Sequence, residues 1–191
     1  MTLEELRADF ECSAKRSLSM PIAGAMYWLA IAIVSTQVPE TVGLLVLLFG
    51  SGSIFPIALL VSKITKEEVF SSKNPLAKLM GMSVLMVNLL WAVHIPLFLY
   101  SPEFLTLSVG IGLGLHWIVY SWIIQHPLGV VHACLRTVLV LTVWFSFPGS
   151  RLLAVGLSIV LVYILSLWQM STRKISQNKI NQQDAACGAA A

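Results

Sequence analysis

The sequence predicts an all-α integral membrane protein, a bundle of six transmembrane helices paired as three hairpins, preceded by an N-terminal amphipathic helix. Two observations lead to this prediction. Only 11% of the residues are charged and 57% are hydrophobic, whereas about a quarter of the residues of a soluble domain are charged. The chain also divides into six apolar stretches, each roughly 20 residues long, which is the length that crosses about 30 Å of hydrocarbon.

Six of the eight prolines stand at the heads of these stretches. Proline is well tolerated in the first turn of a helix, because its missing N–H would have no partner there and its φ is already helical. The prolines therefore predict where the helices begin: Pro21, Pro39, Pro75, Pro102, Pro127 and Pro148. We expect spans over residues 21–38, 41–61, 76–100, 103–124, 128–147 and 150–170.

The segments that flank the spans are polar. In residues 1–19, Thr2 and Glu5 have capping-box spacing, and apolar residues follow at intervals of three and four. This pattern predicts an amphipathic helix on the cytoplasmic side, which either lies on the membrane surface or packs against the ends of the bundle. We expect residues 171–191 to be a disordered cytoplasmic tail, because they are rich in Asn, Gln, Ala and Gly.

The basic residues predict the orientation, because short cytoplasmic loops of membrane proteins collect Lys and Arg. With the N-terminus inside, the outer loops contain one basic residue, Arg151. The inner segments contain the basic residues Arg7, Lys15, Arg16, Lys63, Lys66, Lys73, Lys78, Arg173, Lys174 and Lys179. We therefore expect both termini in the cytoplasm of a bacterium, and a multi-pass protein of its inner membrane. The dispersed basic residues, mixed with acids, indicate no nucleic-acid partner.

Four polar residues are predicted to lie near the middle of the bilayer: Ser53, Asn88, His116 and Arg136. Arg136 is the only charged residue inside the apolar stretches, so no acid of a span can neutralise it. Residue 132 is a histidine one turn away on the same face as Arg136. Arg136 therefore either contacts an anion or solute in a cavity, or extends along its helix to the lipid headgroups.

Glycines and a proline predict two special places in the spans. Gly50, Ser51, Gly52 and Ser53 are followed by Pro56, a combination that weakens the helical hydrogen bonds and bends a helix. Such a break frees backbone carbonyls, which transporters use as ligands. In the series 110–114, alternate residues are glycines, and this spacing favours close packing of a neighbouring helix, with His116 hydrogen-bonded across helices or acting as a proton relay.

We expect no enzymatic activity, no cofactor and no metal site. Nearly all of the chain is needed for the spans, and the four histidines are far apart in the sequence with no carboxylate in the apolar stretches. A nucleophilic pair of Cys134 with a histidine lacks an orienting acid.

Three short motifs carry a resemblance to known proteins: Tyr27-Trp28, Val38-Pro39-Glu40 and the run 55–60, Phe-Pro-Ile-Ala-Leu-Leu. With these motifs, its size and its amphipathic N-terminus, the chain resembles small uncharacterised bacterial inner-membrane proteins of the domain-of-unknown-function type. Its proline-turn hairpins are also distantly similar to HdeD-like acid-resistance proteins. The resemblance implies six spans but no catalytic residue.

Two functional hypotheses follow from these observations. The more specific one is a transporter or channel for a small solute or ion, with a polar site formed by Ser51, Ser53, Asn88, His116, His132 and Arg136. The alternative is a structural or stress-related membrane protein that acts through helix–helix association, for example as a homo-oligomer. Both have membrane lipids as partners. A hydrated cavity that reaches Arg136 favours the first, and a dry core favours the second.

Overall fold

The computed structural model describes residues 1–14, 17–67 and 73–173, and it is helical throughout these ranges, with no strand among them. The ten α-helices and two 3-10 helices of the described chain are α1 Leu3–Ala14, α2 Ser19–Val34, α3 Glu40–Gly50, η1 Ser51–Ser53, α4 Ile54–Thr65, α5 Pro75–Leu89, α6 Trp91–Tyr100, η2 Pro102–Phe104, α7 Leu105–Gly112, α8 His116–Ile123, α9 Leu128–Ser146 and α10 Arg151–Thr172. The expected tail beyond Arg173 lies outside the described residues.

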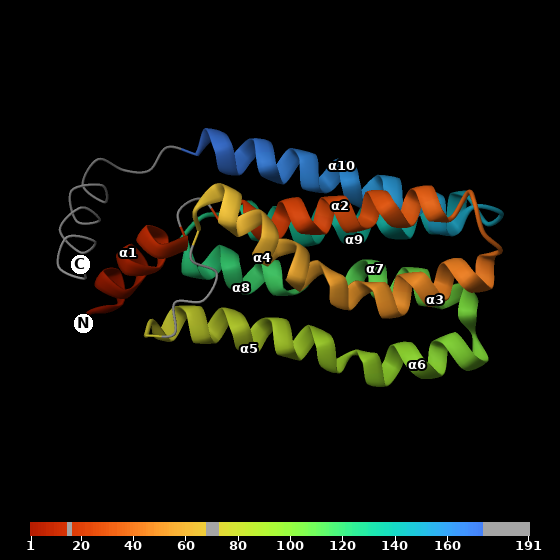
Figure 1. Ribbon diagram of the computed structural model, residues 1–191, viewed down its shortest axis with the longest axis horizontal. Helices are drawn as coiled ribbons and strands as arrows, with labels where there is room; N and C mark the ends of the chain where they lie inside the picture. The colour runs from red at the N-terminus through yellow and green to blue at the C-terminus, as the bar shows by residue number, and fades with distance from the viewer. Residues whose placement is uncertain (15–16, 68–72, 174–191) are drawn as a thin grey trace.

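The helices form three antiparallel hairpins, as the sequence predicts (Figure 1). The turns after α2, α6 and α9 lie at one end of the bundle. The beginning of α1 and the end of α10 lie at the opposite end, together with the short link between α8 and α9. We call this second end the α1 end.

Three of the six predicted spans are interrupted. The expected bend at residues 51–53 is confirmed, because the short 3-10 helix η1 separates α3 from α4 there. A single residue, Leu90, separates α5 from α6. Residues 113–115 form a turn that separates α7 from α8, where the sequence predicted only close packing. Both unpredicted interruptions disturb the regular pattern of helical hydrogen bonds.

Five helical segments are long and apolar enough to cross a membrane: Glu40–Thr65, Pro75–Tyr100, Pro102–Ile123, Leu128–Ser146 and Arg151–Thr172. The first predicted span is shorter than expected, because α2 has 16 residues and ends at Val34. It passes the same test only together with α1, relative to which it is bent by 54°. The number of candidate spans in the described chain is therefore five, or six with this bent pair.

The helix α1 packs against the α1 end of the bundle. Its predicted capping box is present, since the Thr2 amide donates to Glu5 at 2.8 Å and the Glu5 amide to Thr2 at 3.3 Å. Asn74, which also caps α5, donates to Asp9 at 2.7 Å. Glu11 forms an ion pair of 2.8 Å with Arg173, and both side chains are largely buried. These contacts favour the interpretation that α1 is docked on the bundle.

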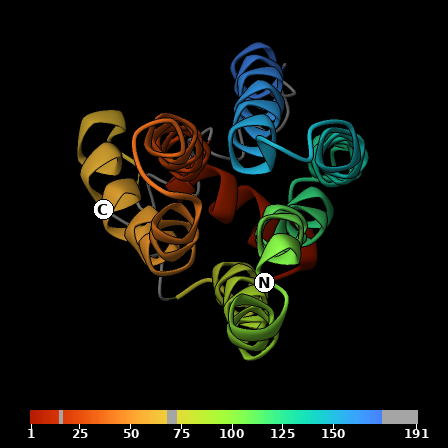
Figure 2. The same ribbon diagram turned by 90° about the vertical axis from the view of Figure 1, so that its right-hand side faces the viewer.

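Seen end-on, the bundle is an open ring of neighbours (Figure 2). The helix α2 packs against α4 and α10, α10 against α9, α9 against α7 and α8, and α8 against α5. The ring is open between α4 and α5. The buried core lies inside it and includes Trp28, Trp117, Val140 and Ile159.

Candidate functional site: a buried arginine and a neighbouring cavity

Arg136 lies in the centre of the bundle and is fully buried. His132 and Arg136 share one buried face of α9, as expected, and Val140 and Trp144 continue this buried face at the same spacing of four. The Arg136 Nε donates a hydrogen bond of 2.6 Å to the Gly110 carbonyl, and its Nη1 one of 3.3 Å to the Tyr163 hydroxyl. The side chain therefore stays inside the protein and does not extend to the lipid headgroups.

The turn between α7 and α8 makes room for this arginine and gives it an acceptor. In a continuous helix the Gly114 amide would donate to the Gly110 carbonyl. Here it donates to the Ile111 carbonyl at 2.9 Å, and the Gly110 carbonyl accepts from Arg136. A Cβ atom on Gly114 would lie 2.8 Å from the Arg136 Cδ, closer than carbon atoms approach. The glycines that the sequence assigned to helix packing thus accommodate a cation.

No acidic residue of the described chain neutralises Arg136. The ion pairs within the described ranges join Met1 to Glu5, Arg7 to Glu4 and Arg173 to Glu11, all at the α1 end. The guanidinium lies 5.3 Å from the ring centre of Trp28 and 5.7 Å from that of Tyr163, so aromatic faces contribute part of its stabilisation. Its Nη2 is buried without a hydrogen-bond partner.

His132 lies one turn from Arg136 and stacks on Trp117, with ring centres 3.9 Å apart and planes 10° apart. Its Nδ1 is 2.7 Å from the Ser166 hydroxyl, which itself donates to the Val162 carbonyl. The one hydroxyl proton is therefore used, so Nδ1 must be the donor to Ser166. In a neutral ring Nε2 then carries the lone pair, and a proton taken up there would place a second cation beside Arg136.

Five buried nitrogen atoms around this arginine lack a hydrogen-bond partner: Trp28 Nε1, His116 Nδ1, Trp117 Nε1, His132 Nε2 and Arg136 Nη2. Their side chains form a connected group, because Trp117 stacks on His132 and its ring centre is 6.3 Å from that of His116. Buried donors without acceptors are costly. Three of these atoms, the two indole nitrogens and Arg136 Nη2, are donors, whereas His132 Nε2 carries a lone pair in the neutral ring. A group with three unpartnered donors and one permanent positive charge is suited to bind an anion.

The structure brings together three of the six predicted site residues, His116, His132 and Arg136. Asn88 is exposed on α5 and donates to the Val84 carbonyl of its own helix at 3.1 Å. Ser51 donates to the Leu48 carbonyl at 2.7 Å within the bend, and Ser53 is half-buried in the same bend. These three residues do not join the group around Arg136.

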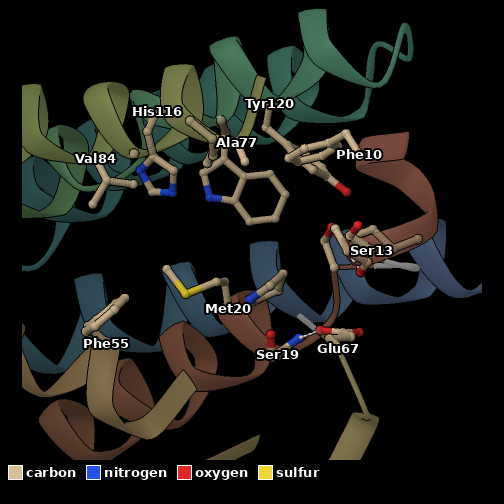
Figure 3. A pocket seen from close by; sticks show the side chains of 17 residues that line it. Phe10, Ser13, Ser19, Met20, Phe55, Glu67, Ala77, Val84, His116 and Tyr120 are labelled. Carbon is tan, nitrogen blue, oxygen red and sulfur yellow. Dashed lines mark hydrogen bonds between the residues drawn. The ribbon is translucent and has the colours of Figure 1, made fainter. Parts of the chain in front are cut away.

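His116 connects this group to a cavity of about 200 Å³ between α4 and α5 (Figure 3). The imidazole and Tyr120 line one wall, and Met20 and Phe55 line the wall opposite. The other lining residues are Phe10, Ser13, Ala14, Ser17, Ser19, Pro21, Glu67, Ala77, Met80, Gly81, Val84, Trp117 and Met170. Arg136 is not among them, so the cavity reaches the neighbours of the guanidinium but not the guanidinium itself.

Sequence reasoning missed the aromatic partners of Arg136. Tyr163 lies on α10, and only the folded bundle shows that this face of α10 meets α9. Gly24 of α2 could have indicated a close contact between helices at this place, because a Cβ there would lie 2.5 Å from the Tyr163 hydroxyl. The Trp28 and Trp117 rings are buried, but nothing in their positions along the chain indicated a contact with Arg136 or His132.

The model of a family of unknown function, DUF7010, matches residues 3–173, which agrees with the expected resemblance to an uncharacterised membrane-protein family. It shows no similarity to HdeD-like proteins. No curated protein and no solved structure matches the chain.

Proposed function

We propose that this chain, which belongs to the DUF7010 family of unknown function, is an integral membrane transporter or channel. It binds a small anion or an anionic solute at Arg136. The helices that are long enough to cross a bilayer support its place in the membrane. The distribution of basic residues supports cytoplasmic termini, and we place the protein in a bacterial inner membrane.

One observation carries this proposal: the fully buried Arg136 has no acidic partner in the described chain and keeps one free Nη2. A charged side chain at the centre of a bilayer costs a few kcal/mol even on insertion scales, and such residues mark substrate or ion pathways. The carbonyl of Gly110 and the hydroxyl of Tyr163 satisfy two of its donors. An anion would satisfy the remaining donor and neutralise the charge.

The neighbouring side chains support an anion more than a cation or a neutral solute. Trp28 and Trp117 add indole N–H groups without acceptors, and these groups can only donate. No carboxylate of the described chain lies beside them to attract a cation.

The alternative, a protein that acts through helix association, relied on the small-residue face of residues 110–114. That face is occupied within the chain. A Cβ on Gly110 would lie 3.2 Å from both Val140 and Val155, and one on Gly114 would meet Arg136. These glycines let the chain's own helices approach, so they leave no surface for a second protein.

Proteoliposome fluxes of chloride, inorganic phosphate and acetate test the proposal. We expect flux of at least one of these anions with the wild-type protein, and its loss in Arg136→Met, which keeps an unbranched side chain but removes the charge. Arg151→Met is the matched control, since the Arg151 guanidinium also lies over a tryptophan ring, 4.2 Å from the centre of Trp144, but at the start of α10. Flux that is equal in the wild type and Arg136→Met, or equal to that of empty liposomes, would contradict the proposal.

A further inference from the structure

The cavity between α4 and α5 lies where the ring of helices is open. Ala77 and Val84 of α5 lie with His116 and Tyr120 of α8 on one side of the cavity, and Met20 of α2 and Phe55 of α4 lie on the other (Figure 3). At the α1 end it is closed by Phe10 of α1 and by Glu67. The Glu67 carboxylate accepts the amides of Leu18 and Ser19, each at 2.9 Å, so it holds the start of α2 in place. Protein side chains therefore occupy the α1 end of the cavity.

The inside of this cavity suits an apolar group. Its walls include Met20, Phe55, Met80 and Val84, and its volume of about 200 Å³ exceeds the roughly 150 Å³ at which an apolar cavity binds benzene. It therefore accepts a ring or a segment of a hydrocarbon chain.

One polar group in the wall points to a ligand. Trp117 is only 4% exposed, and its Nε1 has no hydrogen-bond partner. Because an indole N–H is a donor only, an oxygen atom from outside the chain is the partner that it needs.

Four lysines lie at the α1 end of α4 and α5, the two helices that flank the cavity. Lys63 and Lys66 lie at the end of α4, and Lys73 and Lys78 lie at the start of α5. All four are exposed, and none forms an ion pair with another described residue. Two of these lysines are next in sequence to residues that line the cavity: Lys66 precedes Glu67, and Lys78 follows Ala77. The Glu67 carboxylate is already bonded to two amides.

We propose that this cavity is a binding site for an anionic phospholipid, with one acyl chain between α4 and α5 and the phosphate group among the four lysines. The opening between α4 and α5 admits a molecule that is already in the bilayer, and the charge of the lysines selects its headgroup. His116 and Trp117 belong both to the cavity wall and to the group around Arg136. The inference does not depend on anion transport, because its test measures lipid retention and its lysines make no contact with Arg136.

The test measures lipid retention by native mass spectrometry of the detergent-purified protein, titrated with phosphatidylglycerol or with phosphatidylcholine of the same acyl chains. We expect the wild-type chain to retain one phosphatidylglycerol molecule, with at least about a hundredfold preference over phosphatidylcholine, because each basic residue near an anionic surface contributes about fivefold. Replacing two lysines, in Lys66→Asn with Lys78→Gln, lowers this preference by about 25-fold. Asparagine is chosen at position 66 because it tolerates the positive φ of 55° found there.

A pair of glycine variants tests the cavity itself. Gly81 lines the cavity, and a Cβ there meets nothing within 4 Å, so Gly81→Leu introduces a branched side chain at the cavity wall with no clash at its Cβ. Gly52→Leu is the matched control, because Gly52 also has nothing within 4 Å but does not line the cavity. We expect Gly81→Leu to lower retention of phosphatidylglycerol at least tenfold and Gly52→Leu to leave it unchanged.

Three results would overturn the inference. Equal retention of the two lipids by the wild type would remove the role of the lysines. Wild-type retention by Gly81→Leu would place the lipid elsewhere. A wild-type dimer that Gly81→Leu dissociates, without retained lipid, would show that a second copy of the chain covers the cavity. Thermal unfolding of each variant, followed by tryptophan fluorescence, separates a lost site from a lost fold.

Discussion

The contact between α8 and α9 yields a sharp prediction, because it positions His132 and Trp117 and depends on one glycine. Gly129, in the first turn of α9, is buried against α8. A Cβ at this position would lie 2.0 Å from the Trp117 carbonyl oxygen and 2.9 Å from its carbon. Both are backbone atoms of a helix, so no side chain can move aside. Gly129→Ala therefore forces α8 and α9 apart.

The expected cost is at the upper end of the range for added methyl groups in a packed core, about 3 kcal/mol in the free energy of unfolding. For a chain of this size 1 kcal/mol corresponds to roughly 2–4 °C in Tm, so we expect a decrease of about 6–12 °C. The matched control is Gly81→Ala on α5. Nothing lies within 4 Å of its added Cβ, and alanine is favoured over glycine inside a helix by about 0.5–1 kcal/mol.

Thermal unfolding in detergent, followed by tryptophan fluorescence, measures both variants. We expect Gly129→Ala to unfold well below the wild type and Gly81→Ala to unfold at the same temperature or slightly above it. If both variants unfold together with the wild type, α8 and α9 do not approach as closely as described, and the stack of His132 on Trp117 cannot be maintained by this contact.

Two further predictions concern the α1 end. Glu67→Ala removes the acceptor of the Leu18 and Ser19 amides and should lower the free energy of unfolding by about 2 kcal/mol. Glu67→Gln keeps one oxygen acceptor and should lower it less. Equal Tm values of Glu67→Ala and the wild type would contradict this capping role. The second prediction concerns His126, whose pKa is lowered by burial and then by the nearby Arg173 charge. The unfolded chain therefore binds a proton at His126 more readily than the folded chain does. As the pH falls below about 6.5, the stability contributed by the neutral ring is lost. His126→Asn keeps an acceptor for the Leu128 amide but does not titrate, and a smaller loss of Tm between pH 7.5 and 5 than in the wild type is the expected result; an identical loss would show that His126 contributes nothing.

The sequence predicted the helices well because their ends depend on local chemistry. Proline at a helix start, the capping box of Thr2 with Glu5 and the Asn74 cap act within a few residues of each other. The bend at residues 51–53 has the same origin, since glycine, serine and proline weaken neighbouring hydrogen bonds wherever the helix lies. The short α2 departs from the prediction because the chain turns at Ser35, before the apolar stretch ends.

The candidate site was only partly predictable, because depth along a helix does not determine the direction of a side chain. Asn88 and Arg136 were both expected near the middle of the bilayer, but Asn88 is exposed and Arg136 is buried. The difference depends on which face each helix turns toward its neighbours. For α9 the face was readable, because His132 and Arg136 share it. For α5 no second polar residue marked a face.

Arg136 and the turn between α7 and α8 stabilise each other. An interrupted helix leaves buried carbonyls without donors, and a buried guanidinium needs acceptors. Here the Gly110 carbonyl accepts from the Arg136 Nε, and the absence of a side chain at Gly114 leaves room for the Arg136 Cδ. Neither feature is stable without the other. Their match still leaves the charge unneutralised and the Nη2 unpartnered. If Arg136 had only a structural role, an acidic side chain could have taken the place of the Gly110 carbonyl and neutralised the charge. The uncompensated charge of Arg136 is therefore the feature that favours a bound anion over a structural role alone.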